Sequence, residues 1–363
     1  MKIDFANLQY QHELYKEEIE DAILKVARNC NFIMGNEVQE LEKSLEDFTG
    51  AKYAVSCSNG TDALLLAMMA LDIKPCDEVI TTPFTFIATA ETIAFLGATP
   101  VFVDIDEKTY NMDASKIEAA ITPKTKAIVP VSLYGQPADM DALEQLKIKH
   151  PKLKIIIDGA QSFGSTYKGK TDSNLGDIST TSFFPAKPLG CYGDGGAVFT
   201  NDEELANKMK SLRLHGQSKR YHHKYIGMGG RLDTIQAAVL NVKLKYYPQD
   251  LLLRQEVARK YTEALETKSN LILPYVDKKT TSAWAQYSIR VKNRDKLQEK
   301  LKLAGIPTAV HYPMPLHLQE CFAYLGYKKG DFPISEIVSR EIMSLPMNPY
   351  VTNEEIEYIV GKL

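Results

Sequence analysis

The sequence has little of what marks nucleic-acid-binding, secreted or membrane-spanning proteins. Its 43 Lys and Arg residues are outnumbered by 46 Asp and Glu residues, which gives a formal net charge of -3. That balance excludes the basic excess needed to bind a phosphate backbone. The first residues are polar and acidic where a secretory signal would be basic and then apolar, and no later run of apolar residues approaches membrane-spanning length. We therefore expect a cytoplasmic protein that binds neither nucleic acid nor membrane.

Cysteine is also scarce. The five cysteines are an odd number, lie far apart, and form neither a CxxC pair nor the spacing of zinc ligands. This pattern predicts reduced thiols and no metal site. The cysteines are Cys30, Cys57, Cys76, Cys191 and Cys321.

The length predicts more than one hydrophobic core. At 363 residues the chain exceeds the usual size of a single core, and its 44% hydrophobic and 25% charged residues are ordinary for a globular protein. After about Tyr246 the sequence changes to a charged helical stretch and then a β-like run. We predict a large domain with an N-terminal arm over residues 1–245 and a smaller α+β domain over residues 246–363.

The pattern before residue 246 indicates an α/β fold. Apolar residues at helical spacing predict a helix from Asn36 to Gly50, with Asn36 and Gln39 as a capping pair and Gly50 as its stop. Short β-branched runs then alternate with helical segments at 89–96 and 138–150. Such alternation predicts a mostly parallel sheet covered by helices on both sides, with ligands beyond the carboxyl ends of the strands. The β-branched runs are EVITTP, TPVFVDID, KAIVPVSLYG and KLKIIIDGAQ.

Two polar turns follow predicted strands. The turn Ser58-Asn59-Gly60-Thr61-Asp62 opens a helix whose N–H groups and dipole favour a phosphate, although a simple helix cap fits the same residues. Asp158 ends the run Ile155-Ile156-Ile157. A carboxylate there can pair with a protonated pyridine nitrogen, and a helix cap is again the alternative.

Lys187 lies in an aromatic and glycine-rich segment, SFFPAKPLGCYGDGGA. Partial desolvation there would lower the pKa of the lysine and make a free amine available for a Schiff base, whereas most lysines are simply solvated. Phe86 follows another strand, where its ring could stack on a flat heteroaromatic or fill the core. The glycines do not form a GxGxxG dinucleotide fingerprint.

Taken in order, these segments resemble the DegT-type (DegT/DnrJ/EryC/StrS) sugar aminotransferases, which are fold type I enzymes that use pyridoxal phosphate. The resemblance covers essentially the whole chain. It implies a mostly parallel seven-stranded sheet in the large domain, a smaller α+β C-terminal domain, and a homodimer with each active site at the interface. The segments are SNGTDAL, TFIAT, DGAQSFG, SFFPAKPLGCYGDGGA, LRLHGQ, GRLDTIQAA and VHYPMPLH.

The resemblance implies roles for individual residues. Lys187 would form the Schiff base and move protons, and Asp158 would pair with the pyridine nitrogen. Related dehydratases have histidine at the lysine position, so the lysine favours transamination, with L-glutamate as amino donor and pyridoxamine phosphate as the intermediate form of the cofactor. The remaining cofactor contacts are implied at the phosphate for Gly60, Thr61 and Ser182, on the ring face for Phe86, and near the ring hydroxyl for Gln161.

One position departs from the family pattern. The segment before Arg231 usually presents an asparagine that reaches the phosphate in the neighbouring subunit, whereas this sequence reads GMGGR with Gly229 at that place. One phosphate contact across the interface is thus in doubt, and a backbone N–H of Gly229 or a water molecule could replace it.

The basic stretch at residues 213–224 bears on the substrate. It resembles the branch that aminates carbon 3 of UDP-linked 2-acetamido-2-deoxy-3-keto-glucuronic acid for surface polysaccharides. Its cations, with Arg231, would suit a diphosphate and a uronate carboxylate, although a solvated basic loop fits equally. Arg231 is the preferred carboxylate partner. The other candidate substrate contacts are His311 and Tyr312 in the smaller domain, with Phe32 and Met34 near the N-terminus.

Three alternatives stay open at this point. Two lie within the family: amination of carbon 4 in a UDP-4-keto-6-deoxy sugar, and amination of carbon 3 in a dTDP-3-keto-6-deoxy sugar. Neither substrate has a carboxylate, so neither needs Arg231. The third is a sensory protein that binds the cofactor without catalysis, and the presence of Lys187 and Asp158 argues against it.

Overall fold

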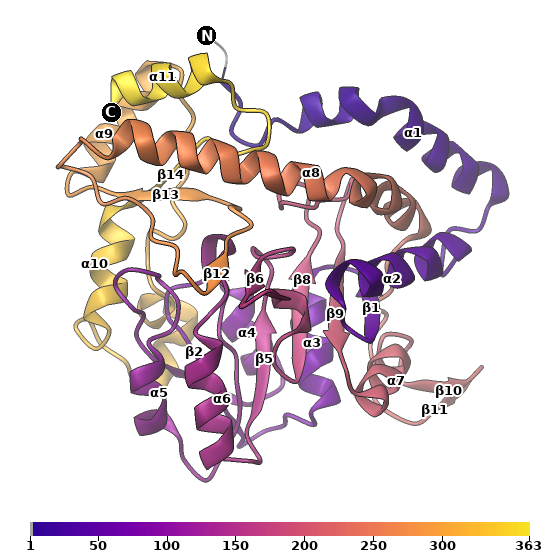
Figure 1. Cartoon of the computed structure of the whole chain (residues 1–363). Helices are drawn as coiled ribbons and strands as arrows, with labels where there is room; N and C mark the ends of the chain where they lie inside the picture. Colours follow the sequence, from indigo (N-terminus) through magenta and orange to yellow (C-terminus); the bar gives the residue numbers. More distant parts are fainter. Residues whose placement is uncertain (1–2) are drawn as a thin grey trace.

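The structure is a computed structural model that describes residues 3–363, and its centre is a seven-stranded sheet (Figure 1). The strand order is β1-β9-β8-β5-β4-β2-β3, and every neighbouring pair is parallel except the two pairs that include β9. The predicted mostly parallel α/β sheet is confirmed. Its strands are β1 (Tyr53–Cys57), β2 (Glu78–Thr81), β3 (Thr99–Phe102), β4 (Thr125–Ile128), β5 (Lys154–Asp158), β8 (Ile178–Ser182) and β9 (Gly196–Thr200).

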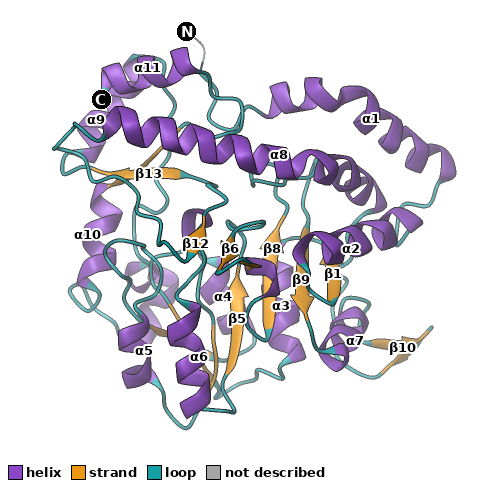
Figure 2. Cartoon of the chain, viewed as in Figure 1, coloured by secondary structure: helices purple, strands orange, loops and turns teal. Residues whose placement is uncertain are grey.

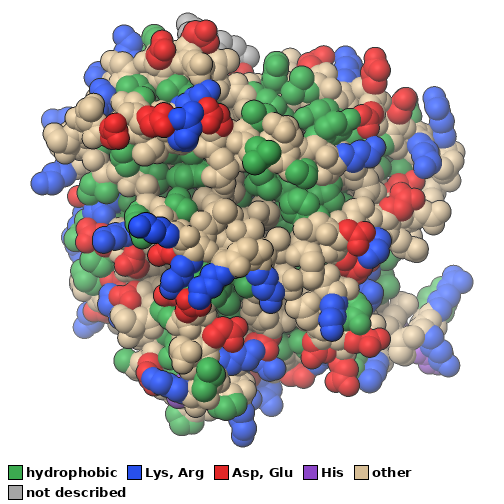
Figure 3. All heavy atoms as spheres, viewed as in Figure 1, with side chains coloured by type: hydrophobic (Ala, Val, Ile, Leu, Met, Phe, Trp, Pro, Cys, Tyr) green, Lys and Arg blue, Asp and Glu red, His purple; other side chains and the backbone are tan. Residues whose placement is uncertain are grey.

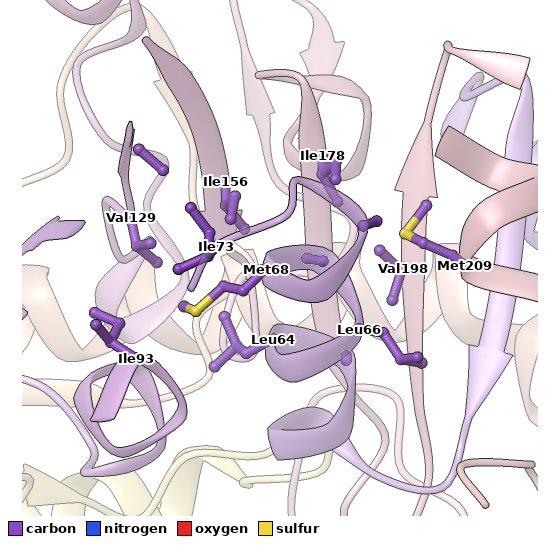
Figure 4. Packing of buried hydrophobic residues seen from close by; sticks show 14 of the residues in the cluster. Leu64, Leu66, Met68, Ile73, Ile93, Val129, Ile156, Ile178, Val198 and Met209 are labelled. Carbon is purple, nitrogen blue, oxygen red and sulfur yellow. The ribbon is translucent and has the colours of Figure 1, made fainter. Parts of the chain in front are cut away.

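Helices cover both faces of this sheet (Figure 2). Alternate residues of one strand enter different cores, because successive side chains of a strand point to opposite faces. In β5, Ile156 packs with α3, α4 and α7 in the cluster of Figure 4, whereas Ile155 and Ile157 pack with α5 and α6. These helices are α3 (Gly60–Ala70), α4 (Ala88–Phe95), α5 (Ala114–Ala120), α6 (Met140–Lys149) and α7 (Glu203–Leu212).

The predicted helix after residue 36 is α2 (Asn36–Thr49), and its stop at Gly50 is confirmed. Gly50 has a φ of 72° and its N–H donates to Glu46 O at 2.8 Å. The predicted capping pair of Asn36 and Gln39 is wrong, because Gly35 is the cap and no side chain bonds the helix end. Gly35 packs directly on Thr234, to whose Oγ1 its N–H donates at 3.1 Å, so the helix begins at Asn36 itself.

A helix of 32 residues, α8 (Thr234–Leu265), runs from the sheet to the C-terminal region. Tyr247 of α8 packs in a core beside the sheet, and Val257 packs in a second core that also includes Ile3. The helix therefore passes through residue 246, and the two-domain division stays a prediction. The C-terminal region consists of the antiparallel pair β13 (Tyr287–Arg290) and β14 (Ile342–Leu345), with α9 (Arg294–Leu303), α10 (Pro333–Glu341) and α11 (Asn353–Lys362).

Two further elements stand out from the main body. Helix α1 (Leu8–Asn29) packs along α8, where the rings of Tyr15 and Tyr246 stack with centroids 4.1 Å apart. The hairpin of β10 (Gln217–Lys219) and β11 (His222–His223) projects from the body near α7, and Figure 3 shows Lys and Arg side chains along it.

Within residues 3–363, no helix has the length and apolar character that a membrane crossing requires.

The remaining short elements are a three-stranded sheet and four 3-10 turns. They are β6 (Thr166–Tyr167), β7 (Lys170–Thr171) and β12 (Thr280–Thr281), with η1 (Leu133–Gly135), η2 (Asp172–Asn174), η3 (Leu316–Leu318) and η4 (Glu320–Leu325).

Candidate active site

The sheet register brings the polar turns to one edge. Cys57 at the end of β1 and Ser182 at the end of β8 both lie opposite Gly196, and Asp158 at the end of β5 lies opposite Thr180 of β8. The turns after β1, β5 and β8 are therefore neighbours at the carboxyl edge, where α/β sheets bind ligands.

Asp158 is the buried acid of this edge. Its side chain accepts hydrogen bonds from Thr89 Oγ1 at 2.7 Å and from the Ala160 N–H at 3.2 Å. Burial raises the pKa of Asp158, while these bonds and the charge of Lys187 oppose the rise. Asp158 is thus a buried carboxylate at the end of β5. A cation placed beside it would stabilise its charged form.

Lys187 lies in a tight loop between β8 and β9. The loop is closed by hydrogen bonds from Lys187 N to Phe184 O and from Cys191 N to Phe183 O, each at 2.8 Å. Lys187 is only partly exposed. Desolvation lowers its pKa below the ordinary lysine value and Asp158 acts in the opposite direction, so a free amine is more accessible here than on a surface lysine.

Gln161 links the turn after Asp158 to the C-terminal region. Its Oε1 accepts the Tyr134 N–H at 2.7 Å, and its Nε2 donates to the Tyr312 hydroxyl at 3.1 Å. Because a backbone N–H can only donate, the orientation of the amide is fixed. The hydroxyl proton of Tyr312 is then free to point elsewhere.

Two rings lie close to these residues. Phe86 is 54% exposed and its ring centroid lies 6.1 Å from that of Tyr312, which excludes a core position for Phe86. Burial and then the charge of Lys187 lower the pKa of His311 to about 4. His311 is therefore a neutral imidazole within electrostatic range of the lysine.

The glycine turn forms a narrow cradle at the start of α3. Asn59 caps the helix by accepting the Asp62 N–H at 2.8 Å. The cap leaves the N–H groups of Gly60 and Thr61 without an acceptor among the described residues. A Cβ placed on Gly60 would lie 2.7 Å from Ser182 Cβ. The capping and phosphate interpretations are thus compatible, since these two N–H groups at the N-terminus of α3 have no acceptor among the described residues and can bind an anion.

The remaining predicted residues lie on a different segment. Gly229 and Arg231 stand at the base of the projecting hairpin, where a Cβ on Gly229 would lie 3.1 Å from His215 Cε1. Phe32 O accepts the Thr234 N–H at 2.9 Å, and Met34 packs partly buried near α2 and α8. These four residues make no hydrogen bond or ion pair with Lys187 or Asp158 in the part of the chain that the structure describes.

The expectation that the cations of residues 213–224 all face a substrate is wrong for Arg213. Its guanidinium is buried, and Nη1 lies 2.5 Å from Glu42 Oε1 and 2.6 Å from Ser56 O. The reason is structural: Arg213 ties α7 to β1 and α2. Lys219, Arg220 and Lys224 on the hairpin are exposed.

Two residues of the site were missed from the sequence. Thr89 bonds the Asp158 carboxylate, and Tyr134 bonds both Gln161 and the His311 carbonyl. Thr89 stands within a segment already singled out, TFIAT, and follows Phe86 by three residues on the first turn of α4. Tyr134 carried no signal, because its position depends on a 3-10 turn with a φ of 58° at that residue.

A family model described as the DegT/DnrJ/EryC1/StrS aminotransferase family matches residues 13–363. Among curated relatives, UDP-2-acetamido-2-deoxy-3-oxo-D-glucuronate aminotransferase of Pseudomonas aeruginosa is 50% identical over 99% of both chains. A pleiotropic regulatory protein of Geobacillus stearothermophilus is 45% identical over 100% of this chain and 98% of the relative. A UDP-N-acetyl-3-dehydro-alpha-D-glucosamine 3-aminotransferase of Acidithiobacillus ferrooxidans is 41% identical over 98% of this chain and 96% of the relative.

Solved structures agree with these relatives. A DegT DnrJ EryC1 StrS aminotransferase from Brucella abortus has a TM-score of 0.95 at 42% identity and covers 99% of this chain and 98% of its own. The ntda structure from Bacillus subtilis, with bound cofactor PMP, has a TM-score of 0.92 at 31% identity and covers 99% of this chain and 84% of its own.

Proposed function

Because the chain belongs to the DegT/DnrJ/EryC1/StrS aminotransferase family, we propose that it transfers an amino group from L-glutamate to carbon 3 of UDP-2-acetamido-2-deoxy-3-keto-glucuronic acid. The chain is an aminotransferase that depends on pyridoxal phosphate. The observation that carries the substrate assignment is the 50% identity over 99% of both chains with the relative that is named for this sugar.

The proposed site fits the cofactor. Pyridoxal phosphate, when bound, supplies an aldehyde that takes up the amino group and a protonated ring that withdraws electrons from the donor. The buried Asp158 carboxylate has no cationic partner besides the charge of Lys187 among the described residues, so it suits the ring nitrogen. The open N–H groups of Gly60 and Thr61 beside Ser182 suit the phosphate.

Each side chain of this site has a separate proposed role. Lys187 Nζ would hold the cofactor and move a proton, and its lowered pKa makes the free amine more available than on a surface lysine. Asp158 would pair with the protonated ring nitrogen, and Thr89 donates a hydrogen bond to that carboxylate. Phe86 would cover the ring face and Gln161 would contact the ring hydroxyl, while the Gln161 amide also donates to the Tyr312 hydroxyl.

Arg231 is the proposed partner of the uronate carboxylate, because a guanidinium can bind a carboxylate with two hydrogen bonds. Phe32, Met34, His311 and Tyr312 are proposed to line the sugar site. The segment of Gly229 and Arg231 matches the one that reaches the neighbouring subunit in the family that the sequence resembles, so we assign both residues to the site of a second copy of the chain.

A homodimer is part of this proposal. Helix α1 exposes Leu8, Tyr10 and Leu14, each more than 40% exposed, and Figure 3 shows hydrophobic side chains gathered between α1 and α8. Contiguous apolar surface of this kind is typical of an interface. Sedimentation that yields only the mass of one chain would contradict this part of the proposal. A cytoplasmic location and a role in surface polysaccharide synthesis also belong to the proposal.

The test is a matched pair of substrates. The 3-keto sugars of UDP-linked 2-acetamido-glucuronate and of UDP-N-acetylglucosamine differ only at carbon 6, which is a carboxylate in the first and a hydroxymethyl group in the second. We expect wild type to prefer the uronate, and Arg231→Ala to lose that preference, by about 1.5–3 kcal/mol or roughly ten- to a hundredfold in kcat/KM. Equal use of both sugars by wild type would contradict the substrate assignment.

The panel also includes the rival substrates. Faster turnover of a UDP-4-keto-6-deoxy or dTDP-3-keto-6-deoxy sugar would favour those alternatives. The panel also tests the non-catalytic alternative, because one relative that is 45% identical is named as a regulatory protein. That role predicts that glutamate leaves the visible spectrum of the cofactor unchanged.

A further inference from the structure

A buried lysine of α8 contacts the loop that carries Lys187. Lys243 is 4% exposed, and its Nζ donates a hydrogen bond of 2.5 Å to the carbonyl oxygen of Gly190. Gly190 follows Lys187 by three residues and is itself buried. Lys243 has none of the roles proposed above, although it bonds the backbone of this loop directly.

The surroundings of Lys243 do not favour a cation. Its Nζ forms no ion pair with any residue in the range 3–363, and it lies 5.4 Å from the ring centroid of Tyr192. Burial lowers the pKa of Lys243 to about 8, while the charge of Asp250 acts in the opposite direction. The side chain is therefore still largely protonated at neutral pH. Because a buried charge without an ion pair costs stability, support of the fold alone accounts poorly for this lysine.

Helix α8 holds the loop at a second point. Gln236 Oε1 accepts the Tyr192 N–H at 2.8 Å, two residues beyond the carbonyl that Lys243 binds. Gln236 and Lys243 are seven positions apart, which places them on the same face of the helix. One face of α8 thus fixes both a donor and an acceptor in the backbone that follows Lys187.

The loop transmits a displacement of Gly190 to Lys187. A Cβ on Gly190 would collide with the carbonyl group of Pro185, so the two backbone segments are in direct contact. The N–H of Lys187 donates to Phe184 O at 2.8 Å and closes the turn between them. A shift of the Gly190 carbonyl therefore also moves the turn that presents the lysine.

We propose that Lys243 and Gln236 are positioning residues for Lys187: they hold the backbone of residues 190–192 so that Lys187 Nζ keeps its reach toward the aldehyde of the cofactor. This inference rests on the proposed role of Lys187 as the Schiff-base lysine. Neither Lys243 nor Gln236 would touch the cofactor, and both would act through the loop.

The first measurement requires neither cofactor nor turnover. Hydrogen–deuterium exchange of the apoprotein reports the amides of Lys187 and Cys191, which both bond carbonyl groups within the loop. We expect exchange to be about tenfold faster in Lys243→Met, which has a side chain of similar length without the donor, and close to wild type in Lys243→Arg. Unchanged exchange in Lys243→Met would overturn the proposal.

The second measurement concerns the Schiff base. Borohydride reduction of the holoenzyme followed by peptide mapping gives the fraction of cofactor attached to Lys187. We expect a smaller fraction in Lys243→Met, and a kcat about ten- to a hundredfold lower with a much smaller change in KM for glutamate, because a misplaced reacting group loses rate more than affinity. Both should recover in Lys243→Arg. A lower thermal midpoint with wild-type trapping and kcat would show a purely structural role and contradict the proposal.

Two further variants sharpen the test. Arg294→Met is the matched control, because it removes another buried cation that donates to a carbonyl, that of Ile342 at 2.9 Å. Equal effects of Arg294→Met on loop exchange and on trapping would contradict a specific role of Lys243. Gln236→Leu removes the second contact of α8 with the loop, and it tests the proposal even if Lys243→Met does not fold. Wild-type exchange and trapping in Gln236→Leu would overturn the paired role.

Failure of this inference is separable from failure of the proposed site. If borohydride attaches the cofactor of the wild-type protein to another lysine, the role of Lys187 is wrong and the inference fails with it. If the cofactor maps to Lys187 while Lys243→Met keeps wild-type exchange and trapping, only the positioning role fails.

Discussion

Gly60→Ala tests the cradle at the start of α3. An added Cβ would lie 3.1 Å from Ser182 Oγ and 2.7 Å from Ser182 Cβ, and the second distance is shorter than real Cβ atoms show. Neither backbone can easily withdraw, because Cys57 and Ser182 are both paired with Gly196. We therefore expect the variant to shift the start of α3 away from β8.

The magnitude follows from two opposing effects. Overpacking of this kind costs about 1–3 kcal/mol, and the better helix propensity of alanine offsets at most about 1 kcal/mol. Unfolding of the apoprotein by urea should show a net loss of about 1–2 kcal/mol. Cofactor affinity should fall about tenfold or more, because a displaced N–H weakens a charge-assisted bond worth about 1.5–3 kcal/mol.

Two variants control this experiment. Gly361→Ala in α11 adds a Cβ with nothing within 4 Å and should be neutral or stabilising. Gly60→Ala combined with Ser182→Gly removes the clash and should recover much of the stability, while cofactor binding stays weak because the Ser182 hydroxyl is lost. Wild-type stability and cofactor affinity in Gly60→Ala alone would refute the cradle argument.

Three further changes give separate tests. Lys187→Ala should abolish turnover while the thermal midpoint stays close to wild type, and residual transamination with glutamate would contradict the role of the amine. Asp158→Asn should slow transamination by about ten- to a thousandfold, since a neighbouring charge changes a pKa by about one to three, and a wild-type rate would show that the carboxylate is dispensable. Asp172 is fully buried, its side-chain partners within residues 3–363 are Ser132 and Ser162, and burial raises its pKa to about 6. The folded state therefore binds the proton more tightly, so this group costs about 3 kcal/mol of stability as the pH rises from about 4 to 6. Asp172→Asn should remove that loss in urea unfolding, and an unchanged pH dependence would contradict the assignment.

Much of the fold could be predicted because its signals are local. The strand that ends at Asp158 contains the apolar run Ile155-Ile156-Ile157, and the stop of α2 at Gly50 needs only a residue that tolerates a positive φ. The cap of α2 could not be predicted, because Gly35 is placed by Thr234, a residue 199 positions away.

In the candidate site, too, the local features could be predicted and the long-range contacts could not. Lys187 and Asp158 lie in turns whose place at the sheet edge follows from parallel pairing, so their proximity could be expected. Tyr134 and Ser344 could not, because their contacts with Gln161 and His311 join the large core to the C-terminal strands. Arg213 was assigned to the substrate because it begins a basic stretch. Its actual partner, Glu42, is far away in sequence and could not be predicted.

Helix α8 limits how the molecule can move. At about 1.5 Å per residue it is a rod of roughly 48 Å, and Tyr247 and Val257 anchor it in two different cores. Ile3 secures the beginning of the chain in the second of these cores. A swing of the C-terminal strands would have to bend this helix or detach it from one anchor, and Pro248, which lies between the anchors and has no backbone N–H, is its weakest point. Movement of one core relative to the other is therefore coupled to the shape of α8 around Pro248.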